Sequence, residues 1–116
     1  MKIVNLEKFL SLPKDVVYAK FEPNLFGAVT IKADTSSSSG DWWYQDLLEV
    51  YVKDNEEWDT ILSKAVEKGV SFDLDYESIG RDGLYEKNQL FAVFEKKDVV
   101  ALIERLKKTL SDYPEI

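Results

Sequence analysis

The feature that most constrains the fold is a complete helix signal over residues 54–69. Asp54 and Glu57 have the D-x-x-E spacing of a capping box, which satisfies backbone N–H groups at a helix start. Gly69 stands where a left-handed C-cap is expected. Between them, apolar residues recur at the helical spacing i, i+3, i+4, i+7 and i+8. These residues are Trp58, Ile61, Leu62, Ala65 and Val66.

Strand patterns lie on both sides of this helix. Apolar and polar residues alternate in the flanking segments, as they do in half-buried strands. The first two segments are separated by PNLFG, whose turn-forming residues predict a hairpin. GRDG at residues 80–83 predicts another turn. The predicted strands are residues 16–22, 28–32, 42–52, 70–78 and 89–95.

Two further helices are predicted near the ends of the chain. Asn5 is a good N-cap for a short helix that Pro13 ends. The segment 97–110 has an apolar stripe at helical spacing, and Lys107 and Lys108 lie in its last turn, where the helix dipole favours cations. The stripe consists of Val99, Leu102, Ile103, Leu106 and Leu110.

The resulting element order is α-β-β-β-α-β-β-α. Short turns between consecutive strands favour an antiparallel sheet. We therefore predict a single α+β domain over residues 1–116, with about five strands and with three helices mainly on one face. The serine-rich segment 35–40 is predicted to be a flexible loop. The second face of such a sheet stays open unless another element covers it.

The composition excludes several classes of chemistry. The 116 residues include no His and no Cys, which excludes Ser-His-Asp and Cys-His catalysis and the usual zinc sites. A formal charge of -7 opposes binding to nucleic acid and to anionic lipid. No apolar run is long enough to span a membrane, and the first ten residues lack a signal peptide's apolar region. We expect a cytoplasmic protein with no cofactor.

The acidic segment DLDYESIGRDG resembles a calcium loop only in part. Asp73, Asp75 and Glu77 fit its first three ligand positions. Ser78 stands where the loop requires Gly, and Leu84 stands where it requires a bidentate Glu. We therefore expect no metal site. A small hydrolase that uses these carboxylates remains the weakest of the alternatives, and we expect no catalytic residues.

Two adjacent tryptophans carry the main functional hypothesis. Neighbouring side chains of a strand point to opposite faces, so Trp42 and Trp43 cannot both enter one core. If helices cover Trp42, then Trp43 lies on the open face, where Tyr18 and Phe26 join it. Exposed aromatic clusters mark interaction sites. Cover for Trp43 from the serine loop or the N-terminal helix, and the reverse face assignment, both stay open.

Much of the chain resembles a group of short acidic proteins encoded by bacteriophages, prophages and bacterial genomes. The resemblance lies in YAKFEPNLFGAVTIK, DWWYQDL and GRDGLYEKNQLFAVFEKKDVVALIERL. It implies a phage or prophage setting and supplies no catalytic residue. The predicted function is a non-catalytic protein-binding module, for example a phage accessory factor that binds a host protein. The alternative is a self-associating structural protein, a homodimer that uses the open sheet face.

Overall fold

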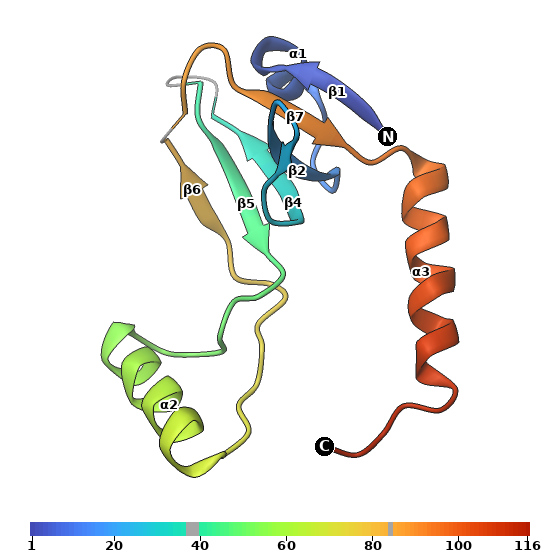
Figure 1. Ribbon diagram of the computed structural model, residues 1–116. Coiled ribbons are helices and arrows are strands. Elements are labelled where there is room, and N and C mark those ends of the chain that lie inside the picture. The colour runs from blue at the N-terminus through green and yellow to red at the C-terminus, as the bar shows by residue number, and fades with distance from the viewer. Residues whose placement is uncertain (37–39, 84) are drawn as a thin grey trace.

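The computed structural model describes residues 1–36, 40–83 and 85–116 and confirms an α+β fold with three helices (Figure 1). Its sheet is antiparallel throughout and has seven strands in the described residues, rather than about five. The order is β1-β7-β2-β4-β5-β6, and β3 pairs with β2. The strands are β1 (Lys2–Asn5), β2 (Val17–Glu22), β3 (Leu25–Phe26), β4 (Thr30–Thr35), β5 (Trp42–Asp46), β6 (Gly80–Asp82) and β7 (Leu90–Val93).

The first two helices begin where their capping residues predict. In α1 (Leu6–Ser11), the Asn5 side chain accepts a hydrogen bond from the Lys8 backbone N–H. In α2 (Asn55–Lys68), the Asp54 side chain caps the Glu57 N–H, and the Glu57 carboxylate accepts from the Lys53 N–H. A capping box also starts α3 (Lys96–Leu110). A capping interaction involves residues within a single turn, so the local sequence was enough to predict where these two helices begin.

Two strand predictions and one turn prediction were wrong. Residues 70–78 form no strand, apart from one bridge between Val50 and Leu74. The Asp75 carboxylate accepts from two following backbone N–H groups, and this turn ends any extended run. The predicted GRDG turn is instead mostly β6. The third strand ends at Asp46, well before residue 52.

The core lies on one face of the sheet, beneath α1. Phe9 of α1 stacks on Phe91 of β7 with ring centroids 3.9 Å apart. Trp42 of β5 meets the Phe9 ring edge-on at 5.1 Å, and Tyr18 of β2 completes the cluster. All four are buried. Strands distant in sequence therefore share one aromatic core, which fixes the pairing around it.

The two long helices contribute little to this core. Neither α2 nor α3, both within the described residues, contains a buried residue. Figure 1 shows both helices extending beyond the outline of the sheet. Of the three helices, α1 is the one that supplies a core residue.

We expect Gly80→Ala to destabilise the sheet by about 1–3 kcal/mol. Gly80 pairs with Tyr44, and an added Cβ would lie 3.0 Å from the Tyr44 ring carbon Cζ. The Tyr44 ring packs against the aromatic core, so it cannot move aside cheaply. Gly83→Ala is the matched control, because its nearest contact is an Asp41 carboxylate oxygen at 3.3 Å. Urea unfolding measures both variants, and equal losses would contradict the argument.

Candidate functional site

The two tryptophans lie on opposite faces of β5, as the strand period predicted. Trp42 is 0% exposed, and its indole Nε1 donates a 2.9 Å hydrogen bond to the Tyr18 hydroxyl. Trp43 is 38% exposed and pairs with Arg81 of β6. Trp42 therefore belongs to the core, and Trp43 belongs to the other face of the sheet.

The expected placement of Tyr18 beside Trp43 is corrected by the structure. Tyr18 is only 3% exposed and lies with Trp42 in the core. Tyr18 pairs with Thr30 of β4, and Thr30 pairs with Asp46 of β5. Asp46 and Trp42 point to the same face of β5, so Tyr18 and Trp42 lie on one side of the sheet. Side chains of β2 alternate between the two faces as predicted. The pairing of β2 with β4 and β5, however, puts Tyr18 on the face of Trp42 and not on the face of Trp43.

Phe26 does share a face with Trp43. It pairs with Phe21 of β2, and the two rings pack with centroids 5.1 Å apart. Register carries the face of Phe21 across β4 to Trp43. We call this surface the open sheet face. Its larger apolar residues, all half-buried or exposed, are Ile3, Phe21, Phe26, Ile31, Trp43 and Leu90.

The Trp43 ring is held in place by a charged neighbour. The Arg81 guanidinium carbon lies 5.8 Å from the indole centroid, within cation–π range. The same guanidinium forms a 2.7 Å ion pair with Asp41, and its Nε donates to the same carboxylate at 2.9 Å. The indole is therefore oriented without being covered, a geometry that favours contact with another molecule.

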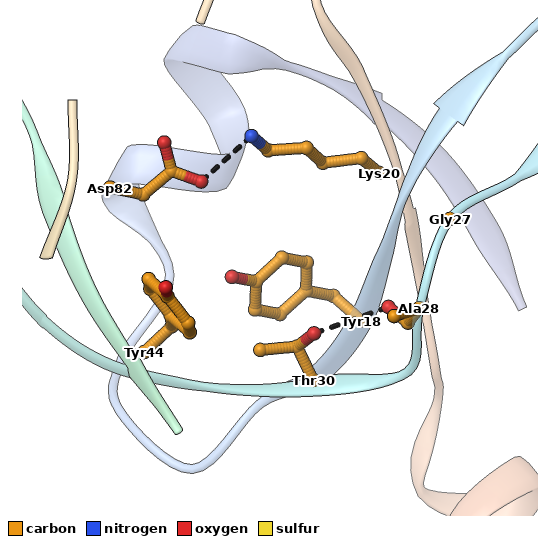
Figure 2. Close-up of a pocket in the computed structure, with 7 residues that line it drawn as sticks. All are labelled: Tyr18, Lys20, Gly27, Ala28, Thr30, Tyr44 and Asp82. Carbon is orange, nitrogen blue, oxygen red and sulfur yellow. Dashed lines mark hydrogen bonds and ion pairs between the residues drawn. The ribbon is translucent and has the colours of Figure 1, made fainter. Parts of the chain in front are cut away.

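A small pocket of about 220 Å³ opens on the core side of the sheet (Figure 2). Lys20 and Asp82 form a 2.7 Å ion pair there, and the Tyr18 ring lies between that pair and Thr30. Burial raises the pKa of the Tyr18 hydroxyl far above its ordinary value, so the phenol stays neutral. The volume is below the roughly 300–1,000 Å³ of most ligand pockets.

Lys32 is a buried cation that sequence reasoning missed. It is 1% exposed, and its Nζ donates to the Leu12 carbonyl, the Ala33 carbonyl and the Thr35 hydroxyl at 2.9, 3.2 and 2.7 Å. Burial lowers the pKa of this ammonium below 10.5, although nearby Asp34 partly opposes the shift. The group is enclosed and hydrogen-bonded, so it cannot reach a substrate. In the sequence, the one indication of this burial is that Lys32 lies two residues after Thr30, so both side chains point to the same face of the strand.

The acidic segment does not assemble into a site. The Asp75 carboxylate is occupied by the backbone N–H groups of Glu77 and Ser78. The Asp73 carbonyl accepts from the Tyr51 N–H, which ties the segment to the chain after β5. Among residues 1–36, 40–83 and 85–116, no group of three or more carboxylates is placed to hold a metal ion.

The comparisons with known proteins add no relative. No family model matches the chain, and neither the curated proteins nor the solved structures contain a match. In the described part of the chain, every helix is too short or too polar to cross a membrane. The case for a function therefore depends on the geometry above.

Proposed function

We propose that the protein is a non-catalytic protein-binding module whose contact surface is the open sheet face. The observation that carries this proposal is the exposed Trp43 indole, oriented by Arg81. Tryptophan is among the residues that dominate binding energy at protein interfaces. Fixing its orientation beforehand reduces the entropy lost on binding.

Charge suggests the chemistry of the partner. The chain carries 22 acidic and 15 basic residues, for a net charge of -7. Complementary potentials speed association and exclude wrong partners, so the partner we propose has a basic surface around an apolar patch. The resemblance to phage-encoded proteins makes a host protein the first class to test.

The chemistry of the side chains supports binding over catalysis. The sequence offers no His or Cys as a base or nucleophile. Burial keeps the Tyr18 phenol neutral, and Lys32 is enclosed by hydrogen-bond acceptors. A surface for binding is therefore the stronger proposal than a carboxylate-based hydrolase.

A photo-reactive phenylalanine analogue in place of Phe26, which is exposed on the same face and leaves Trp43 intact, is expected to cross-link to the partner in producing cells. Mass spectrometry identifies the adduct, and the affinity of the purified pair is then measured. Trp43→Ser should weaken that affinity by about 30-fold or more, since interface tryptophans often contribute at least 2 kcal/mol. Lys8→Ser is the control, because Lys8 is exposed on α1, over the other face.

Two outcomes would count against this assignment. Failure to form any adduct at position 26, or unchanged affinity in Trp43→Ser, would remove the open sheet face as the contact surface. An adduct made of two copies of the chain would support the self-associating alternative instead.

A further inference from the structure

α3 is an amphipathic helix without cover in its own chain. Every residue from 100 to 110 is exposed, including Leu106 at 58%. The exposed stripe contains Leu102, Ile103, Leu106 and Leu110. An isolated helix of 15 residues is only marginally stable in water, because most helical stability in proteins comes from packing an apolar face. The stripe therefore requires a partner surface.

α2 also contains no buried residue, although its stripe is less exposed than that of α3. Trp58 and Val66 are exposed, the latter at 86%, whereas Ile61, Leu62 and Ala65 are half-buried. α2 has 14 residues and α3 has 15, so the two helices have closely matched lengths. Within one chain they lie apart on either side of the space below the sheet (Figure 1). Two incompletely covered stripes of similar length could cover each other.

The shape of the chain indicates how much surface a partner would bury. Its radius of gyration is 16.6 Å, whereas a compact domain of this length has about 13 Å. Its accessible surface is 9036 Å², against about 6,500 Å² for a compact monomer of this mass. The excess of about 2,500 Å² per chain is of the order that permanent homodimers bury.

Charge selects which helices meet. In Lys96–Leu110, five basic and two acidic residues give α3 a charge of +3. In Asn55–Lys68, two basic and four acidic residues give α2 a charge of -2. Pairing α3 with α3 would bring like charges together, whereas pairing α3 with α2 brings opposite charges together.

We propose that the protein is a homodimer in which α3 of each copy packs its apolar stripe against α2 of the other copy. The contact occurs twice about a two-fold axis, as an isologous interface requires. A membrane surface is the competing occupant for a basic amphipathic helix. It suits α3 alone, because α2 is acidic and the whole chain carries -7. The dimer covers both stripes.

The first test is absolute mass by light scattering of the full chain over a range of concentrations. We expect twice the mass of one chain. Leu106→Asp should weaken association by about 100-fold, because a carboxylate replaces an apolar anchor at the centre of the stripe. Ala101→Asp is the matched control, since it adds the same carboxylate to the opposite side of α3. Near-ultraviolet circular dichroism of the buried Trp42 checks that each variant is folded.

The second test uses the absence of native cysteine. Val66→Cys is placed in a tagged copy and Ile103→Cys in an untagged copy, and a short bis-maleimide linker is added to the mixture. We expect tagged–untagged adducts to dominate over adducts between two Ile103→Cys chains. The reverse preference would overturn the pairing of α2 with α3.

A monomer at every concentration would overturn the proposal, as would a monomer that binds anionic vesicles through α3. The proposal is independent of the open sheet face. Trp43→Ser should remain dimeric, so loss of partner binding in that variant and loss of the dimer in Leu106→Asp are separate results.

Discussion

Trp42→Ala is expected to destabilise the protein by about 3–5 kcal/mol, because it removes the largest side chain of the core. Trp42 contacts Phe9, Phe91 and Tyr85, with ring centroids 5.1–5.4 Å apart. The substitution also takes away the donor that bonds the buried Tyr18 hydroxyl. Domains of this size are stable by only about 5–15 kcal/mol, so much of the population would unfold on mild warming. Urea unfolding followed by far-ultraviolet circular dichroism measures the loss.

The adjacent residue provides the control. Trp43→Ala should cost less than about 1 kcal/mol, because Trp43 packs mainly against one arginine and lies on the open sheet face. Trp42→Phe should fall between the two variants, since it keeps part of the packing and loses the indole N–H. Similar losses in Trp42→Ala and Trp43→Ala would show that the two faces are assigned wrongly.

Local signals predicted the elements whose determinants are local. The caps at Asn5 and Asp54 and the left-handed Gly69 place α1 and α2, since each acts within a single turn. Strands depend on distant partners. β1 was missed because its pairing with β7 joins residues 2–5 to residues 90–93. The alternation over 70–78 predicted a strand, but the Asp75 turn prevents the pairing that a strand needs.

The same distinction explains the candidate site. The period of two separated Trp42 from Trp43, because this separation is a property of one strand. The face of Tyr18 relative to Trp43 depends on the register of β2, β4 and β5, which no single segment encodes. Burial of Lys32 also depends on register, together with the Leu12 carbonyl that follows α1 and the Thr35 hydroxyl.

Lys32→Ala is expected to destabilise the protein by about 2–4 kcal/mol. The Lys32 ammonium lies 5.7 Å from the Phe9 ring centroid, beside the core. Truncation leaves a void there, and it strips the Leu12 carbonyl of a donor. Lys14→Ala is the control, because Lys14 is exposed in the loop after α1, and we expect a change below about 0.5 kcal/mol. Urea unfolding of both variants tests the difference.

The cost of Lys32→Ala should grow as the pH rises toward 10.5, the ordinary pKa of a lysine side chain. Burial lowers the pKa of the Lys32 ammonium in the folded state, whereas the unfolded chain keeps the ordinary value of 10.5. Between that lowered pKa and 10.5 the unfolded chain binds more protons, so the wild type gains stability with rising pH and the alanine variant lacks this gain. Tyr18 has the opposite effect, but only above its ordinary pKa of 10.0, and both proteins share it. A difference that stays constant over this range would show that Lys32 remains fully protonated in the fold, held by its three acceptors rather than neutralised by burial.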